Sequence, residues 1–348
     1  MHPTPASLQR SIDTEIAEYA PDRIFILTDG NTARHCLPVI CDAGALRGAH
    51  SIVTGCGEEN KNISSLTGIW ESLGSNGATR HSLLINLGGG MITDLGGFAA
   101  ATFKRGIAFI NIPTTLLAMV DAAVGGKTGI NFNGLKNEVG AFCEPRAVLT
   151  DTVFLKTLGA RDIRSGYAEM LKHGLISTRR QWAELIDFDL AQPDTGALQQ
   201  MVGTSVEVKR RIVAQDPHER GIRKALNLGH TVGHAMESFA MTEGRPVPHG
   251  YAVAYGMICE LYLSVVREGF PADRMRQTVS FIKEYYGQMP VTCGDYDTLL
   301  SLMHHDKKNV GSEINFTLLA DIGDIRINQT VTDEEIKEAL DFYREGIG

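Results

Sequence analysis

The stretch Ser82-Leu-Leu-Ile-Asn-Leu-Gly-Gly-Gly90 decides the fold class of this chain. Its apolar part predicts a buried strand, because a strand that is covered on both faces reads as a continuous hydrophobic run. Glycines directly after a strand permit unusual backbone angles and let phosphate groups approach the backbone amides. The spacing is not G-x-G-x-x-G, so the turn alone is a weak dinucleotide signal, and a tight turn with packing glycines is an open alternative.

Ionisable residues and one asparagine, in a setting of small residues, follow this turn. They are Arg105, Asp121, Lys127, Lys136, Asn137, Glu169 and Lys172. Lysines among glycines and alanines do not build a core, but they can aim positive charge at a bound ligand. The whole chain has a formal net charge of −8, so this local positive charge suits a pocket for a small anionic molecule. The acidic balance argues against nucleic acid or an anionic membrane as a partner.

Further apolar runs on both sides of the opening stretch predict the rest of the architecture. Strands are expected at 23–28, 51–54, 82–87 and 107–112, with a helix near 63–75. Strands that alternate with helices are typical of parallel β-α-β units, so residues 1–157 are expected to form an α/β, Rossmann-like, nucleotide-binding domain. Residues 158–348 are expected to form a mostly helical domain that binds metal and substrate. We expect the active site between the two domains, where ligand sites are common.

The predicted elements of the second domain are read from its helical periodicity. Helices are expected at 161–178, 181–190, 196–215, 224–240, 250–268 and 273–286, followed by one extended piece at 314–319 and a final helix from Asp333.

The cysteines and the apolar content indicate the compartment. The six cysteines at 36, 41, 56, 143, 259 and 293 form no C-x-x-C pair, which is typical of thiols in a reducing cytoplasm. Met1-His-Pro-Thr-Pro5 lacks the pattern of a signal peptide, and no apolar run reaches the roughly 18 residues of a membrane span. We therefore expect a soluble, cytoplasmic protein.

A second motif predicts a metal site. Gly229-His230-Thr-Val-Gly-His234-Ala-Met-Glu237 places two histidines at i and i+4, on one face of a helix. Two imidazoles placed in this way can share or neighbour a divalent metal. With Glu169 upstream and His249 downstream, a Glu/His/His set with an open position is typical of catalytic zinc. For each histidine alone, a hydrogen-bonded core or surface residue is the alternative.

These residues together resemble the 3-dehydroquinate synthase family over nearly the whole chain. The motifs that carry the resemblance are Gly88-Gly-Gly-Met-Ile-Thr-Asp-Leu-Gly-Gly-Phe98, Arg105-Gly, Pro113-Thr-Thr-Leu-Leu117, Val120-Asp-Ala-Ala-Val-Gly-Gly-Lys-Thr-Gly129, Lys136-Asn137, Gly140-Ala-Phe142, Ala168-Glu-Met-Leu-Lys-His-Gly174 and Asn227-Leu-Gly-His-Thr-Val-Gly-His-Ala235.

The resemblance implies a fold, an activity and cofactors. It implies a Rossmann-like domain before a helical domain, NAD and Zn²⁺ or Co²⁺ as cofactors, and a homodimer. The implied substrate is 3-deoxy-D-arabino-heptulosonate 7-phosphate, a phosphorylated sugar acid of the shikimate route to aromatic amino acids. Transient oxidation by NAD, elimination of phosphate, re-reduction and an aldol cyclisation would yield 3-dehydroquinate.

The resemblance also assigns residues. The metal ligands would be Glu169, His230 and His249. The positions that match the NAD site are Asp29, Asn31, Glu58, Lys61, Gly89, Gly90, Asp94, Thr114, Thr115 and Thr157. Those that match the substrate site are Arg105, Asp121, Lys127, Lys136, Asn137, Lys172, Lys209, Arg223, Asn227 and Lys307, with Lys308 competing for the last role. Direct catalytic roles are expected for Lys127, Lys172, His234, Asn137 and Arg223.

Some alternatives stay open at this point. Lys209, Lys307 and Lys308 can be solvated surface charges, and Thr114 and Thr115 can be structural caps. A sister sugar-phosphate cyclase, such as 2-deoxy-scyllo-inosose synthase, shares most motifs, but Arg223 and Asn227 match a carboxylate site, and arginine suits bidentate carboxylate recognition. A metal-dependent alcohol dehydrogenase of the glycerol dehydrogenase type needs no cationic pocket. A third alternative is a regulatory or structural protein that binds metal and NAD without catalysis.

Overall fold

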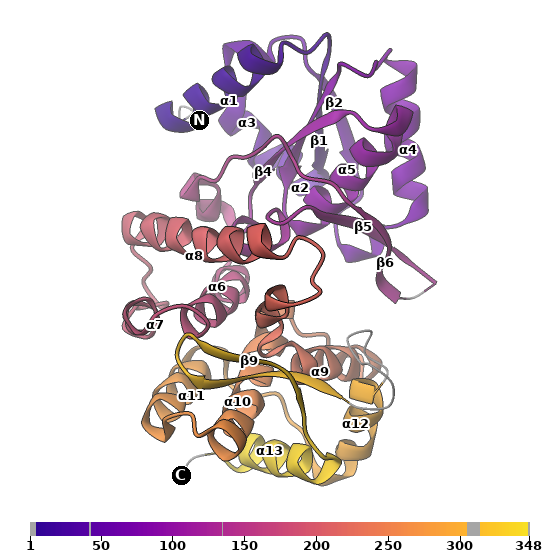
Figure 1. The fold of residues 1–348 in the computed structure, drawn as a ribbon. Coiled ribbons are helices and arrows are strands. Elements are labelled where there is room, and N and C mark those ends of the chain that lie inside the picture. Colours follow the sequence, from indigo (N-terminus) through magenta and orange to yellow (C-terminus); the bar gives the residue numbers. More distant parts are fainter. Residues whose placement is uncertain (1–4, 42, 134, 305–313, 347–348) are drawn as a thin grey trace. The chain divides into compact units, whose positions relative to one another are not determined.

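The computed structural model describes residues 5–41, 43–133, 135–304 and 314–346 (Figure 1). The chain divides into two compact units, Met1–Gly159 and Ala160–Gly348, where the sequence predicted a boundary after residue 157. The first unit contains a parallel sheet with helices and the second is largely helical, which confirms the predicted fold class.

A five-stranded parallel sheet in the order β2-β1-β3-β4-β7 is the frame of the first unit. Its strands are β1 (Ile24–Asp29), β2 (His50–Thr54), β3 (Leu83–Gly88), β4 (Ala108–Pro113) and β7 (Ala147–Val148). The first four match the predicted apolar runs. β3 pairs with β1 and β4 and is buried throughout, as expected for a central strand. With two residues, β7 is too short to have a sequence pattern.

Five α-helices accompany the sheet in the described part of the first unit. They are α1 (Ala6–Tyr19), α2 (Gly30–His35), α3 (Leu37–Ile40), α4 (Ile63–Ser75) and α5 (Gly90–Thr102). Of these, α2 begins directly after β1, and α5 begins just after the end of β3. Leu66, Ile69 and Leu73 of α4 form one apolar stripe at helical spacing, and this stripe packs in the same core as Phe25 of β1 and Leu95 of α5.

An antiparallel hairpin of β5 (Lys127–Phe132) and β6 (Leu135–Phe142) completes the first unit. We did not predict it, because β6 is exposed along most of its length and its sequence shows no alternation of apolar and polar residues. Its inner strand packs on α5, where a side chain at Gly97 would lie 2.5 Å from Thr128 of β5.

The second unit is built around α10. Its helices are α6 (Ala160–Leu175), α7 (Arg179–Ile186), α8 (Thr195–Gln215), α9 (His230–Thr242), α10 (His249–Glu268), α11 (Ala272–Tyr286), α12 (Tyr296–His304) and α13 (Asp333–Glu345). α10 packs against α6, α9, α11 and α13, and it is apolar on nearly all sides, as a helix enclosed by others must be.

Two predictions for the second unit were wrong in detail. The helix expected at 224–240 is interrupted, because Gly229 has φ 80° and separates a 3₁₀ turn (Ile222–Asn227) from α9. The single extended piece at 314–319 is one arm of an antiparallel hairpin, β8 (Asn315–Asp321) and β9 (Asp324–Thr330). β9 was missed because its residues are polar and at most partly buried.

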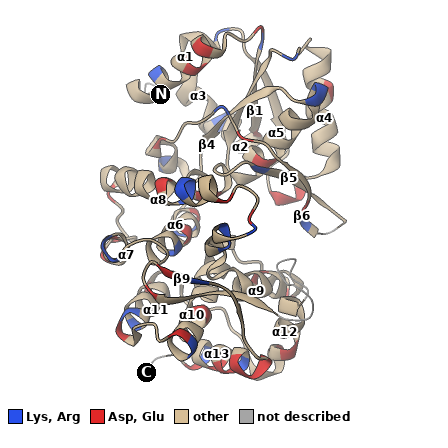
Figure 2. Cartoon of the chain, in the orientation of Figure 1, with Lys and Arg blue, Asp and Glu red and all other residues tan. Residues whose placement is uncertain are grey.

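The distribution of charge and hydropathy is ordinary. Acidic and basic residues are interspersed along the helices of both units (Figure 2). Among the described residues, none of the helices has the length and apolar character that a membrane span requires.

Candidate metal centre and active site

The three predicted metal ligands lie on three different helices of the second unit. Glu169 is in the middle of α6, His230 is the first residue of α9 and His249 is the first residue of α10. Glu169 is fully buried, His230 is nearly so, and the side chain of His249 is 28% exposed. The tertiary fold therefore brings together residues that are up to 80 positions apart in the sequence.

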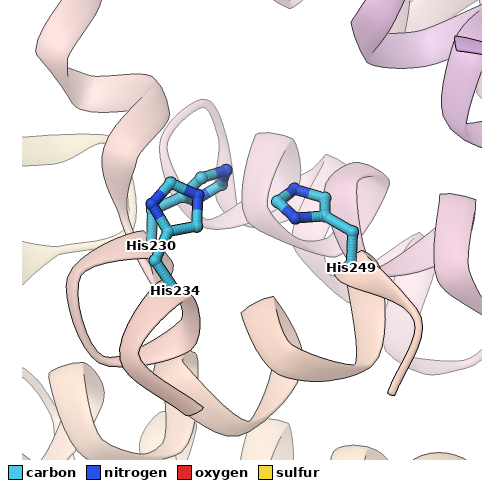
Figure 3. A group of neighbouring side chains, drawn as sticks. All are labelled: His230, His234 and His249. Carbon is cyan, nitrogen blue, oxygen red and sulfur yellow. The ribbon is translucent and has the colours of Figure 1, made fainter. Parts of the chain in front are cut away.

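The spacing of the ligand atoms fits a tetrahedral divalent metal. The Glu169 Oε1 atom lies 3.5 Å from the Nε2 atom of His230 and 3.5 Å from the Nε2 atom of His249. Ligand atoms that are each about 2.1 Å from a tetrahedral metal lie about 3.4 Å apart. The imidazole rings of His230 and His249 lie edge-on to each other, with ring centroids 5.4 Å apart (Figure 3). One carboxylate oxygen and two imidazole nitrogens with an open fourth direction form the donor set of a catalytic site.

Hydrogen bonds at the far side of each ring fix which nitrogen faces the metal position. The His230 Nδ1 atom lies 3.1 Å from the carbonyl oxygen of Leu228, and the His249 Nδ1 atom lies 3.2 Å from Glu237 Oε2. An Nδ1–H that donates to oxygen leaves the Nε2 lone pair for a metal, and such partners also raise the basicity of the ring. Both histidines are therefore oriented as ligands.

Glu237 is the one member of this site that we did not assign from the sequence. It follows His230 by seven residues and His234 by three, so all three lie on one face of α9. That periodicity is the signal that could have identified it, because a carboxylate on the same face as a ligating histidine is a natural partner for another ligand.

The carboxylate of Glu169 has a second partner on its own helix. Its Oε2 atom forms a buried ion pair with the Nζ atom of Lys172, one turn later in α6. Both side chains are at most 1% exposed, so the positive charge of Lys172 is held next to the metal position in a setting of low polarity. A buried cation at this point can face an anionic ligand without competition from water.

His234 extends the cluster toward solvent. It lies one turn after His230 on α9, its ring centroid is 5.3 Å from that of His230 and 5.8 Å from that of His249, and it is partly exposed. The ligand nitrogens of the three histidines lie within 4.8 Å of one another. The Glu169 Oε1 atom lies 3.5 Å from the Nε2 atoms of His230 and His249, which supports these two residues as metal ligands, and His234 is the third ring of the cluster (Figure 3).

The pKa of His249 predicts how metal uptake depends on pH. Burial alone would lower this pKa, but the hydrogen bonds and negative charges of Glu169 and Glu237 raise it to about 10. At pH 7 the metal-free protein therefore carries a proton on His249 that a metal must displace. We expect uptake of Zn²⁺ to release about one proton from this residue at pH 7 and metal affinity to rise with pH up to about pH 10.

Calorimetric titrations in two buffers of different ionisation enthalpy measure this proton count. Glu237→Gln is the matched control, because it removes one of the two carboxylates that hold the proton and should lower the number released at pH 8. A binding heat that is the same in both buffers would contradict the expectation.

A loop before α9 positions two predicted substrate residues. The Asp216 carboxylate accepts backbone N–H bonds from Arg220, Gly221 and Arg223, and these lower its pKa against the opposing effect of desolvation. Arg223 is 2% exposed, and its guanidinium donates to the Pro217 carbonyl at 2.6 Å. In the same loop, Asn227 donates to Glu219 Oε1 at 3.0 Å. Lys209 of α8 is also buried, which contradicts the alternative that Lys209 is a solvated surface charge.

The glycine turn after β3 lacks one of its two expected features. Gly88, Gly89 and Gly90 all have negative φ, so unusual backbone angles do not explain them. Lack of space for a side chain explains them: a Cβ at Gly88 would lie 2.5 Å from Ile92, and one at Gly89 or Gly90 would lie 3.1 Å from a neighbouring side chain. Gly89 caps α5 without a side-chain hydrogen bond, so the turn presents the first amides of that helix.

Lys61 is the centre of a cluster that joins three predicted NAD residues, Lys61 itself, Asp94 and Glu58, to the predicted substrate residue Asn137. The buried Nζ atom of Lys61 lies 2.5 Å from Asp94 Oδ2, 2.5 Å from Asn137 Oδ1 and 3.9 Å from Glu58 Oε1. Burial raises the pKa of Asp94, while the charge and hydrogen bond of Lys61 lower it. Asn131 fastens the hairpin to this point by donating to Glu58 Oε1 at 2.9 Å.

The remaining NAD positions lie at the carboxyl ends of the strands and in the segment that follows β7. Asp29 ends β1 and caps α2 through a reciprocal pair of hydrogen bonds with Thr32, while Asn31 is exposed in the same helix. Thr115 accepts from the Ala118 amide at 3.2 Å, so it acts as a structural cap. Burial raises the pKa of Cys36 to about 11, and hydrogen bonds with Thr157 and Thr114 oppose this, so the two threonines converge on one buried thiol.

The other substrate positions of the first unit are spread over its surface. Lys127 begins β5, Lys136 lies on β6, and both are exposed, while Asp121 is partly buried in a π-helical turn (Ala118–Ala122). Arg105 is exposed and has φ 67°. It follows α5, whose other end begins at the glycine turn, so the structure does not bring Arg105 to the Lys61 cluster.

Arg105 lines an open pocket of about 570 Å³ with Thr79, Arg80 and Lys104. Lys307 and Lys308 lie outside the described residues.

Comparisons with known proteins agree with this geometry. The family model described as 3-dehydroquinate synthase N-terminal matches residues 51–165, and the one described as 3-dehydroquinate synthase C-terminal matches residues 166–309. The chain is 58% identical to a 3-dehydroquinate synthase from Parabacteroides distasonis over 94% of its own length and 93% of that protein.

Solved structures of similar proteins contain the predicted cofactors. A 2-deoxy-scyllo-inosose synthase complexed with carbaglucose-6-phosphate, NAD⁺ and Co²⁺ is 25% identical, with a TM-score of 0.84 over 98% of this chain and 95% of that one. A 2-epi-5-epi-valiolone synthase from Streptomyces hygroscopicus with NAD⁺ and Zn²⁺ is 26% identical, with a TM-score of 0.83 over 99% and 96%. On the two family models and the 58% identity over nearly the full length, the chain belongs to the 3-dehydroquinate synthase family.

Proposed function

We propose that this chain converts 3-deoxy-D-arabino-heptulosonate 7-phosphate to 3-dehydroquinate and phosphate, as a carbon–oxygen lyase that uses NAD and a divalent metal. The observation that carries the proposal is the convergence of Glu169, His230 and His249 with Lys172, in a chain that is 58% identical to a member of the family. This convergence supplies a metal site and a buried cation at one place.

Glu169, His230 and His249 are proposed to hold the metal. Their mixed oxygen and nitrogen donors suit Zn²⁺ and Co²⁺ alike, and similar proteins contain one or the other. When bound, the metal polarises a substrate hydroxyl and lowers its pKa. Lys172 then holds an anionic oxygen of the substrate beside the carboxylate of Glu169. His234, at the rim, exchanges a proton with the substrate through a ring nitrogen.

The glycine turn and the Lys61 cluster are proposed to bind NAD. The amides of the first turn of α5 offer donors and a partial positive charge to the pyrophosphate. NAD held there would supply reversible hydride transfer without net consumption. Because Lys61 bonds both Asp94 and Asn137, it ties the proposed cofactor site to one residue of the proposed substrate site.

Cationic side chains are proposed to recognise the two anionic groups of the substrate. Arg223 is buried, and its loop is organised by the carboxylate of Asp216, so its guanidinium is presented in one orientation for a carboxylate. Lys209, which is buried in the same unit as Arg223, is proposed to meet the phosphate, because each phosphate oxygen gains from charge-assisted donors. Lys127 and Lys136 of the first unit stay predicted substrate residues. The homodimer and the cytoplasmic location stay predictions.

The test is an assay of phosphate release with purified protein, catalytic NAD and Zn²⁺. With 3-deoxy-D-arabino-heptulosonate 7-phosphate we expect stoichiometric phosphate and 3-dehydroquinate, identified by mass, without net NADH. Glucose 6-phosphate and sedoheptulose 7-phosphate are matched controls that lack the carboxylate and should give no carbocycle. Turnover of either control without turnover of the sugar acid would contradict the proposal, and so would accumulation of NADH with polyols.

A further inference from the structure

The N-terminus of α9, which carries His230, is capped by a residue from another helix. Gly229 precedes α9 in the left-handed conformation and has no side chain with which to cap it. Glu260 of α10 supplies the cap. Its Oε2 atom accepts from the Gly229 amide at 2.5 Å, and its Oε1 atom accepts from the amides of Thr231 at 3.1 Å and Val232 at 3.3 Å.

The carboxylate of Glu260 is fully buried, so its position needs strong compensation. The helix end provides it, because the first amides of a helix have no intrahelical acceptor and carry partial positive charge. Glu260 accepts hydrogen bonds from the backbone on both sides of His230, at Gly229 and at Thr231. The direction in which His230 leaves the backbone is therefore set by Glu260.

The same helix that carries Glu260 also carries His249. The two residues are 11 positions apart, about three turns, and lie on the same face of α10. α10 thus presents one metal ligand itself and holds the backbone of the other. The side chain of Glu260 links the two independently of any metal.

Close helix packing makes this link rigid. A Cβ at Gly256 of α10 would lie 2.1 Å from the Gly229 carbonyl oxygen, and one at Gly233 of α9 would lie 2.8 Å from the Ala252 carbonyl oxygen. The backbones of α9 and α10 are therefore in direct contact. Any movement of the α9 N-terminus must break bonds to Glu260 or separate this contact.

We propose that Glu260 is a positioning residue that fixes His230 relative to His249 and so sets the metal affinity and coordination geometry of the site. This rests on the proposed function, in which His230 and His249 bind a metal. Glu260 itself touches neither substrate nor cofactor.

Glu260→Gln tests the proposal, with Co²⁺ as the probe in the full-length protein. The amide keeps the size of the side chain but turns an NH₂ group toward helix amides that are themselves donors. We expect the Kd for Co²⁺ to rise about 10-fold or more, as for other groups that orient metal ligands, and the visible absorption bands of the bound Co²⁺ to shift.

Ser264→Ala is the matched control for a general loss of stability. Ser264 is buried one turn further along α10, donates to the Glu260 carbonyl at 2.7 Å and accepts from the Leu319 amide at 3.1 Å. Its removal should lower the Tm without touching α9, so Co²⁺ affinity and spectrum should stay at their wild-type values. If Glu260→Gln does not fold, Glu260→Asp keeps the charge, shortens the reach and should weaken Co²⁺ binding in the same direction.

Wild-type Co²⁺ affinity and spectrum in the folded Glu260 variant would overturn the proposal. Equal weakening in Ser264→Ala at a comparable loss of Tm would also overturn it, because the effect would then be one of stability alone. A wild-type protein that binds no Co²⁺ would instead contradict the proposed function, so the two failures are distinguishable.

Discussion

Glu169→Gln is expected to lower kcat/KM by roughly 10³-fold and to leave the purified protein with far less than one metal ion per chain. The Oε1 atom of Glu169 lies 3.5 Å from the Nε2 atom of each histidine, so the substitution takes away the carboxylate donor of the proposed metal site. A neutral amide is a weaker ligand than a carboxylate, and loss of the metal removes about 4 kcal/mol of charge stabilisation. Metal analysis and steady-state kinetics on the same preparation measure both effects.

Glu169→Gln also removes the carboxylate that pairs with the buried charge of Lys172. Lys172 is 1% exposed, and removing one member of a buried pair costs about 3–5 kcal/mol of folding free energy. The double variant Glu169→Gln/Lys172→Met removes the charge and its partner together and should recover much of the Tm without recovering activity. Glu184→Gln breaks an exposed ion pair with Arg180 and should change neither the Tm nor the activity. Full metal content and more than about a tenth of wild-type activity in Glu169→Gln would contradict the ligand assignment.

Gly250→Ala is expected to lower the free energy of unfolding by about 3 kcal/mol and to weaken metal binding. Gly250 follows His249 in α10 and packs on α6, where its amide donates to Ser165 Oγ at 3.1 Å. A Cβ there would lie 1.8 Å from the Ser165 carbonyl oxygen. Since the obstacle is backbone, α6 must move away from α10, and this separates Glu169 from His249.

Gly203→Ala is the matched control within the same unit. Gly203 lies in the interior of α8, is exposed, and has open space where its Cβ would be. Alanine there should raise stability by about 0.5–1 kcal/mol through helix propensity. Urea unfolding of both variants and Zn²⁺ titration of the folded proteins give the comparison. A Gly250→Ala protein that matches Gly203→Ala in both would show that α6 and α10 can adjust without cost.

Sequence periodicity succeeded where one physical force dominates a segment. The apolar runs that became β1, β3 and β4 are strands because burial on both faces requires an unbroken apolar run, and β3 is buried along its whole length. His230 and His234 lie on one face of α9 because 3.6 residues per turn places i and i+4 together. It failed for the β5–β6 hairpin, where exposed and partly polar strands carry no such period. It also failed at Gly229, whose left-handed conformation divides a segment that reads as one helix.

The amino-acid sequence by itself determined the fold class and the family and proposed the metal ligands, because these depend on local patterns and on motifs in a fixed order. Only the tertiary structure decided how the ligands are held. The bonds from Glu237 to His249 and from Glu260 to the backbone around His230 join helices that are separate in sequence. Such contacts depend on which faces of distant helices meet, and here glycines at 229, 233, 250 and 256 allow backbones to touch. The partner of the buried Glu260 carboxylate is a property of that packing, which no local pattern records.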